Sequence, residues 1–296
     1  MRKKKFLDGY GVYILWFAFY FALTGFAVSI FVISRIKAWL ITASIYAVTL
    51  SLAFTPQGEK LYKLLHGVRP LYTTHEKEKI LPVFREVHKS MSGKYKKNSC
   101  KTELCISDSL IPNAFAMGEN TLVVTKGLLE SMTEEQIKGI LAHEFGHLLH
   151  GDTKAAVFTF VGNGILNITA LIVRKVLQFI IRLTDSLSTG MIGMIFFGMI
   201  NATFRFLLFF FELFLFIVQE GGEVILMAKR RRDELWADYY AYKSDYGEEL
   251  VSALYDLEMM TALKTLSVME QLKASHPHTA RRIGYLERWL GVSIKQ

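Results

Sequence analysis

Two histidines stand four residues apart in the stretch LAHEFGHLLHGD, which begins at residue 141, and a glutamate follows the first of them. In an α-helix, residues i and i+4 project from one face about 6 Å apart, so His143 and His147 can hold one metal ion. Neutral imidazole is a good zinc ligand. Glu144 follows too closely to bind with the same geometry, but it can take a proton from a water held at the ion. The spacing therefore predicts a helix that carries a catalytic zinc site.

A catalytic zinc site needs a third protein ligand and leaves one coordination position open. The extended metzincin pattern would supply a histidine at position 153, where this chain has Thr153, so a later carboxylate is expected instead. The stretch RDELWAD offers Glu234 and Asp238, which are four residues apart and share a helical face. One of them can ligate zinc while the other accepts the outer N–H of a ligand histidine, and spacing leaves that choice open. His150 lies off this face and is expected at the surface or beside the ligands.

The helix that carries the histidines has a recognisable start. Thr133, with Gln136 three residues later, forms a capping box. The predicted helix therefore begins at Glu134 and runs to about Leu149. The charged residues on both flanks of the motif indicate that this helix lies in water and not in lipid.

The elements before this helix indicate a small mixed unit. Residues 74–91 predict an amphipathic helix, because apolar residues recur on one side of it. Those residues are Ile80, Leu81, Phe84 and Val87. Residues 104–106 and 121–124 predict short strands, and the stretch PNAFA at residues 112–116 predicts an extended edge between them. Residues 118–120 predict a turn.

Long apolar blocks surround this unit. Residues 10–34 and 38–53 carry no charge, and the first block is long enough to cross a bilayer, whereas the second is near the lower limit. They predict a membrane hairpin that turns at residues 35–37. The first block is too long for the apolar part of a signal peptide and has no small-residue cleavage site after it, so it is interpreted as an uncleaved anchor.

The second apolar region is harder to divide. Residues 155–173 predict a third span, the charges between residues 174 and 185 predict a short turn, and residues 187–204 predict a return span. Arg205 and Glu212 interrupt the apolar run that follows, and they share a helical face because they are seven residues apart. Since charges in lipid are costly, this face is expected either to meet protein or water or to lie at the membrane interface.

The net charge of +8 comes largely from basic clusters beside the apolar blocks. That placement suits anionic lipid headgroups and the control of membrane topology, and it excludes a nucleic-acid-binding function. With four spans, most of these clusters fall on one side, which predicts that the polar parts face the cytoplasm. Cys100 and Cys105 are expected to be free thiols, because two cysteines make neither a disulfide framework nor a four-sulfur zinc site.

These features divide the chain into four segments. Residues 1–56 predict a transmembrane hairpin, and residues 57–152 predict a soluble α+β unit with the edge strand and the zinc helix. Residues 153–219 predict a second transmembrane hairpin, and residues 220–296 predict a helical part that carries the third ligand. The predicted fold class is α+β, mostly α-helical, with about four transmembrane helices and a small β-sheet.

The motifs HEFGHLLHGD and DELWAD resemble those of the HtpX family of membrane-bound zinc metalloproteases, which are relatives of the CAAX prenyl proteases. The stretch PNAFAMGENTLVVTKGLL resembles the family's substrate-edge strand and the hairpin after it. The pairs HP at residues 276–277 and RI at residues 282–283 resemble its C-terminal signature. The resemblance covers most of the chain and implies a gluzincin-like fold. His278 and Leu235 depart from common family choices but do not touch the proposed chemistry.

The resemblance implies a role for each residue of the zinc constellation. His143, His147 and Glu234 become the ligands of one zinc ion per chain. Glu144 becomes the general base, and Asp238 supports a ligand histidine. These assignments select one arrangement among those that the spacing left open.

The resemblance also implies which residues line the active site. It places His276 and Arg282 where they would stabilise the oxyanion of a tetrahedral intermediate. It puts Asn113, Ala114 and Phe115 on the edge strand, to which a substrate would add as a further strand.

The sequence therefore predicts a membrane-anchored, zinc-dependent endopeptidase that acts on proteins at the cytoplasmic face of a bacterial-type inner membrane. The resemblance alone implies a role in membrane protein quality control or the stress response. The expected partners are protein or peptide substrates, above all membrane proteins, and the lipid bilayer, but not nucleic acid.

Three alternatives differ from this prediction in class. An intramembrane zinc protease would carry its zinc helix in lipid, which the charged flanks oppose. A membrane scaffold or partner-binding protein with a structural or vestigial zinc would not need Glu144, because zinc binding does not require a base at that position. A transporter is disfavoured by the small number of spans and the large soluble unit.

Overall fold

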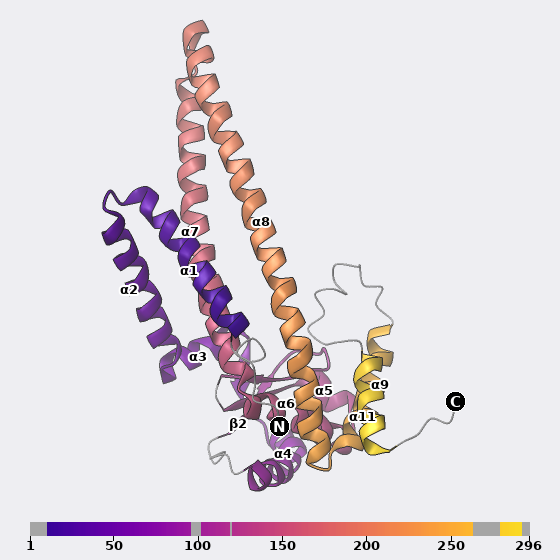
Figure 1. The fold of residues 1–296 in the computed structure, drawn as a ribbon. Coiled ribbons are helices and arrows are strands. Elements are labelled where there is room, and N and C mark those ends of the chain that lie inside the picture. Colours follow the sequence, from indigo (N-terminus) through magenta and orange to yellow (C-terminus); the bar gives the residue numbers. More distant parts are fainter. Residues whose placement is uncertain (1–10, 96–101, 119, 263–278, 292–296) are drawn as a thin grey trace. The chain divides into compact units, whose positions relative to one another are not determined.

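Helices make up most of the chain, and they accompany one small sheet (Figure 1). The computed structural model describes residues 11–95, 102–118, 120–262 and 279–291. The chain divides into two compact units, which we call the apolar unit (Met1–Ser51 and Phe158–Leu226) and the sheet unit (Leu52–Val157 and Met227–Gln296). Four helices in the described residues are long and apolar enough to cross a membrane. The predicted fold class is therefore confirmed.

The apolar unit begins with a hairpin of two helices, α1 (Gly11–Phe31) and α2 (Arg35–Ala53). The predicted turn at residues 35–37 was three residues too late, because Arg35 already begins α2 and the connection is residues 32–34. Aromatic packing joins the two helices. The ring of Tyr46 meets the edges of Phe17 and Phe21 at centroid distances of 5.1 and 5.2 Å.

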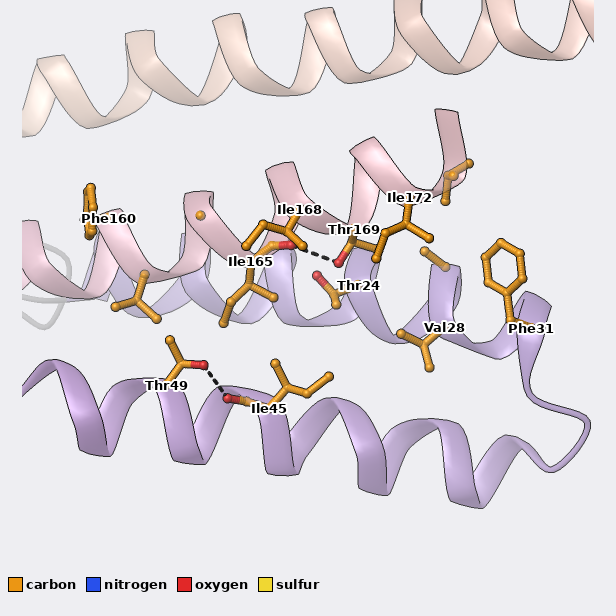
Figure 2. Close-up of a pocket in the computed structure, with 14 residues that line it drawn as sticks. Thr24, Val28, Phe31, Ile45, Thr49, Phe160, Ile165, Ile168, Thr169 and Ile172 are labelled. Carbon is orange, nitrogen blue, oxygen red and sulfur yellow. Dashed lines mark hydrogen bonds between the residues drawn. The ribbon is translucent and has the colours of Figure 1, made fainter. Parts of the chain in front are cut away.

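An apolar cavity of about 510 Å³ lies among α1, α2 and the first half of α7 (Figure 2). Three threonines line it, and each of their hydroxyls is already hydrogen-bonded within the protein. Thr24 pairs with the Tyr46 hydroxyl, while Thr49 and Thr169 donate to backbone carbonyls one turn earlier. The cavity therefore offers an apolar surface with its polar groups satisfied.

The second apolar region forms one long hairpin of α7 (Asp152–Leu187) and α8 (Gly190–Lys243). The turn predicted between residues 174 and 185 is wrong, since α7 continues through these residues and the chain turns at residues 188–189. The candidate span in α7 has 32 residues and that in α8 has 34. At 1.5 Å per residue each is about 50 Å long, well beyond the roughly 30 Å of a hydrocarbon core.

A ladder of polar pairs joins α7 to α8. Gln219 donates to Asn167 over 2.8 Å, Arg174 donates to Glu212 over 2.7 Å, and Arg205 donates to Asp185 over 3.0 Å. Asn201 adds to the last rung by donating to the Ile181 carbonyl and to Asp185. The first two rungs are seven residues apart on both helices, which is the repeat of a helical seam.

The polar ladder explains why the predicted turn is absent. A charge inside an apolar helix must find a partner or leave the lipid. Arg174 finds Glu212 across the hairpin, so the helix does not need to end there. The sequence left open whether Arg205 and Glu212 meet protein, and in the structure both contact α7.

The sheet unit contains the remaining elements. The bounds of its helices and strands are α3 (Pro56–Leu65), β1 (Val68–Pro70), α4 (Thr74–Tyr95), β2 (Glu103–Ser107), β3 (Ala114–Met117), β4 (Thr121–Thr125), α5 (Lys126–Ser131), α6 (Glu134–His150), α9 (Gly247–Ala262) and α11 (Thr279–Leu290). The predicted amphipathic helix corresponds to α4, and the predicted strands correspond to β2 and β4. The predicted extended edge, residues 112–116, overlaps β3.

The strand order is β1-β2-β4-β3, so β3 lies at an edge of the sheet. The pair β2–β4 is parallel, whereas β1–β2 and β3–β4 are antiparallel. The two faces of the sheet pack against different helices. Leu104, Ile106 and Leu122 belong to the main core with α4, α6 and α9, while Cys105 and Val123 pack on the other face with Tyr62 of α3. The sheet therefore lies between α3 and α6.

Candidate metal centre

The helix α6 is defined at both ends by local chemistry. Thr133 and Gln136 form the predicted capping box, and Gly151 ends the helix in the left-handed conformation at φ 85°. The rings of His143 and His147 meet edge to face at a centroid distance of 4.9 Å. His143 and Glu144 are buried, so this stretch of α6 faces the interior.

A glycine within the motif allows α8 to approach α6. A Cβ atom at Gly146 would lie 2.8 Å from the Cα of Ala237, which is shorter than any normal contact. Ala237 is itself fully buried between Glu234 and Asp238. The small pair Gly146–Ala237 thus brings the backbones together and places the two acids against the histidines.

Three side chains converge at this crossing. One donor atom from each of His143, His147 and Glu234 lies within 4.8 Å of the others. The Nε2 atom of His143 is 3.3 Å from Oε2 of Glu234, and Nε2 of His147 is 3.4 Å from Oε1. Donors about 2.0–2.1 Å from a tetrahedral zinc are about 3.3–3.4 Å apart, and two imidazoles with one carboxylate are a known zinc set. Residue types and distances both fit zinc.

Asp238 lies behind this set and links it to α11. Its side chain is fully buried, and its Oδ1 atom is 2.9 Å from Nδ1 of His143. Arg282 donates two hydrogen bonds to the same carboxylate, over 2.9 and 2.6 Å. Its Nη1 atom also lies 3.3 Å from Glu234. Asp238 therefore holds His143 with its Nδ1 occupied, which leaves Nε2 for a metal.

Burial and charge oppose each other at these groups. Burial and the Arg282 cation disfavour a charged His143, but its contacts with Asp238 and Glu234 outweigh them and raise the pKa of His143. Burial would raise the pKa of Asp238, yet the Arg282 charge and the His143 hydrogen bond lower it. The acids also raise the pKa of Arg282 despite its burial. Arg282 thus remains a fixed cation among the acids.

The edge strand contacts the proposed base directly. The backbone N–H of Ala116 donates to Oε2 of Glu144 over 2.9 Å. Residues that alternate along β3 bond to β4, and Thr125 N–H donates to the Asn113 carbonyl. In this register Ala114 and Ala116 turn their backbone groups away from β4 toward the free edge. The carboxylate of Glu144 therefore lies at the free edge of the sheet, beside β3.

The other predicted site residues are placed as follows. Ala114 and Phe115 lie in β3, whereas Asn113 immediately precedes it. His276 lies outside the described residues. Arg282 lies at the site, but its guanidinium is engaged with acids, which favours a holding role. Its predicted role at an oxyanion stays a prediction.

His150 was expected at the surface or beside the ligands. Its side chain is almost fully buried, with Nδ1 3.8 Å from Asp233, and its ring stacks on Trp236 at 6.0 Å. It joins α6 to α8 one turn beyond the metal ligands.

Sequence reasoning missed two contacts. The Ala116 N–H to Glu144 hydrogen bond depends on strand register, although the edge pattern PNAFA was a signal for it. The Arg282–Asp238 pair joins residues 44 positions apart, and only the fold brings them together.

Comparisons with known proteins agree with this geometry. The sequence model of "Peptidase family M48" matches residues 75–290. The Protease HtpX of Legionella pneumophila (strain Corby) is 52% identical over 46 residues, which are 14% of this chain and 16% of that protein. The match thus spans well under two thirds of that relative. A Protease HtpX homolog from Bacteroides fragilis (strain YCH46) is 26% identical over 253 residues, covering 78% of this chain and 74% of the relative.

A solved structure shares the fold. The crystal structure of S. mikatae Ste24p matches with a TM-score of 0.54 and 19% sequence identity, over 90% of this chain and 62% of that chain. At this identity the likeness concerns the fold alone.

Proposed function

The chain belongs to peptidase family M48, and from this premise we propose that it is a membrane-anchored, zinc-dependent endopeptidase that cleaves proteins at the cytoplasmic face of the membrane. The observation that supports this most is the convergence of His143, His147 and Glu234 directly beside Glu144. A structural zinc site is closed by four protein ligands, whereas a catalytic site has three and an open position.

The residues of the site divide the chemistry between them. His143, His147 and Glu234 would hold zinc, which when bound supplies Lewis-acid polarisation of the scissile carbonyl and acidifies the attacking water. Glu144 takes one proton from that water as it attacks and passes it to the leaving amine as the C–N bond breaks. Ala116 holds the Glu144 carboxylate in place through its N–H.

The edge strand β3 provides a means to bind a peptide in extended form. The N–H and C=O groups of Ala114 and the C=O group of Ala116 point outward, and substrate addition to a sheet edge uses such groups, whereas the N–H of Ala116 is bonded to Glu144. Main-chain pairing recognises a backbone more than a side-chain sequence. A protein or peptide substrate follows from this geometry.

The proposed cellular role is that of an integral membrane protease. The resemblance of its motifs to the HtpX family supports a bacterial-type inner membrane and a role in membrane protein quality control or the stress response, and the chain is similar to proteins named Protease HtpX. The four candidate spans support an integral membrane protein. The basic clusters beside the spans support a cytoplasmic orientation of the sheet unit.

The test compares the full-length, zinc-replete chain in membranes with its Glu144→Gln variant. We expect the variant to keep zinc and lose about 100- to 10,000-fold in peptide cleavage, because it lacks the base. Glu135→Gln, an exposed glutamate on the same helix, is the matched control and should cleave normally. Products identified by mass spectrometry give the rates.

Cleavage by Glu144→Gln at the control rate would remove Glu144 as the base. A zinc-loaded wild-type chain that cleaves no protein would instead favour the alternative of a scaffold with a vestigial zinc site.

A further inference from the structure

The helix α3 presents an apolar face on the outside of the sheet unit. Leu61, Leu64 and Leu65 are 56%, 73% and 63% exposed, and their spacing puts them on one side of the helix. We call these three side chains the leucine face. Lys60 is exposed at its edge.

The opposite side of α3 is fixed to the sheet. Tyr62 packs with the cluster that contains Cys105, Met117 and Val123. This cluster lies on the sheet face opposite the main core. The helix therefore cannot rotate to hide the leucine face without losing this packing.

Polar contacts reinforce that attachment. Lys63 donates to Glu103 at the start of β2 over 2.7 Å, and Thr121 at the start of β4 donates to Glu59 over 3.0 Å. A Cβ atom at Gly118, in the turn between β3 and β4, would lie 3.8 Å from Glu59. The helix thus touches the end of the edge strand.

A tight corner joins α3 to the end of α2. The N–H and the hydroxyl of Thr55 both donate to the Leu52 carbonyl, over 3.0 and 2.6 Å, and the same hydroxyl caps α3 by accepting from Gly58. A Cβ atom at Gly58 would lie 2.0 Å from that carbonyl, so the crossing requires glycine. Leu52 and α3 belong to the same compact unit. The corner therefore fixes the start of α3 against Leu52, within this unit.

The length of α2 places this corner at a membrane boundary. Its 19 residues make a helix of about 28 Å, close to the roughly 30 Å of a hydrocarbon core, and its composition suits a span. The helix α3 begins three residues after α2 ends. An amphipathic helix at the boundary between lipid and water can bring its apolar side into contact with acyl chains.

We propose that the leucine face of α3 docks into the interfacial layer of the lipid bilayer. Helices of this kind lie in the plane of the interface, with leucines among the acyl chains and lysines near the headgroups. The leucine face with Lys60 at its edge has this pattern. Lipid is favoured over a protein partner because the chain continuity with α2 already delivers α3 to the bilayer surface.

This contact fixes the height of the substrate-binding edge, a consequence that rests on the proposed function. The sheet is the layer directly above α3, and adjacent layers are about 10 Å apart. The strand β3 is then held about 10 Å above the interface with its end against α3. Peptides attached to the membrane would be presented to this edge at a higher effective concentration than free peptides.

The first experiment measures lipid contact without reference to proteolysis. A fluorophore is attached to Leu64→Cys in the full chain, in a Cys100→Ser background, reconstituted in phosphatidylcholine–phosphatidylglycerol vesicles with brominated acyl chains. Ile45→Cys, exposed on the α2 span, is the positive control. Glu78→Cys, exposed on α4 across the sheet from α3, is the negative control.

We expect brominated lipid to quench the label at position 64 as it does at position 45 and not at position 78. Quenching of the position 64 label by aqueous iodide instead would show a face in water and overturn the proposal. Shielding from both quenchers would show a protein partner and would overturn it as well.

The second experiment separates this contact from the proposed function. Leu61→Ser, Leu64→Ser and Leu65→Ser are combined and compared with Met259→Ser, an exposed apolar residue of α9. The triple variant should cleave a free peptide at the wild-type rate and a membrane-tethered peptide about tenfold more slowly. Equal loss on both peptides would contradict the role of the contact. No cleavage of either peptide by the wild type would contradict the proposed function while leaving the quenching result intact.

Discussion

The metal centre and the ladder between α7 and α8 are both groups of charged and polar side chains in apolar surroundings, but they are satisfied in different ways. In the ladder each charged group is paired with an opposite charge, as Arg174 is with Glu212 and Arg205 is with Asp185. At the metal centre, Arg282 and Asp238 close on each other, while Glu234 and two imidazoles point their remaining donor atoms at one spot.

This difference suggests a structural role for the ladder and a chemical role for the candidate metal centre. Charged side chains that are paired with each other across two helices fix the register of those helices. A convergent set of two imidazole nitrogens and one carboxylate is a candidate metal site. The sequence shows charged residues in both regions, but only the structure shows whether their side chains pair with each other or converge on one point.

The largest effect is expected at the convergent set. Glu234→Ala removes a ligand, so bound zinc should fall from about one per chain to near zero and cleavage should cease. Asp238→Ala keeps all three ligands but frees the ring of His143, and it should weaken zinc binding by about 10- to 100-fold. Elemental analysis after dialysis against a series of zinc buffers measures both.

Glu248→Ala, an exposed glutamate at the start of α9, should leave zinc binding unchanged. A stronger loss of zinc from Asp238→Ala than from Glu234→Ala would exchange the two roles.

The ladder should show the opposite behaviour under paired substitution. Arg174→Leu or Glu212→Leu alone leaves one charge in an apolar hairpin and should destabilise the fold by about 1–3 kcal/mol. The double variant removes both charges and should recover most of that loss, which no pair of substitutions at the metal centre would do. Thermal unfolding in detergent measures the coupling, and Lys175→Leu is the neighbouring control. Simple additivity of the two losses would mean that this rung is not a closed pair.

A smaller effect is expected from the paired side chains Glu76 and Arg69 in the sheet unit. Glu76 is a closed group there, since it accepts from Arg69 over 2.6 Å and from the N–H groups of Tyr72 and Thr73. The Arg69 hydrogen bond is the main cause that lowers the pKa of Glu76 from 4.5 to about 2. Because the folded pKa is the lower one, this stabilisation is present above about pH 4.5 and is lost as pH falls toward 2.

Glu76→Gln should therefore cost about 1–2 kcal/mol at pH 7 and little near pH 2. Denaturant unfolding of both variants across this range, each compared at equal pH, measures the difference. A deficit that does not shrink with acid would show that the charge of Glu76 is not what stabilises the loop.

The sequence pattern predicted correctly those elements that depend on contacts between residues close together in the chain. The capping box at Thr133 and the amphipathic run of α4 appear as predicted, because caps and helical periodicity depend on residues within a few positions. The turn predicted near Arg174 failed for the complementary reason. A charge in an apolar run ends a helix only if no partner lies across from it, and Glu212 is 38 residues away.

The sequence by itself determined that His143 and His147 share one face of a helix, because i and i+4 positions lie on the same side of any α-helix. It also determined that Glu144 directly follows the first histidine. It also determined that four segments are apolar enough to span a bilayer. Tertiary structure alone decided which acid faces the imidazoles, that Arg282 closes on Asp238, and that Ala116 reaches Glu144. Those contacts join residues 28 to 91 positions apart, and no local rule of spacing governs how separate helices and strands cross.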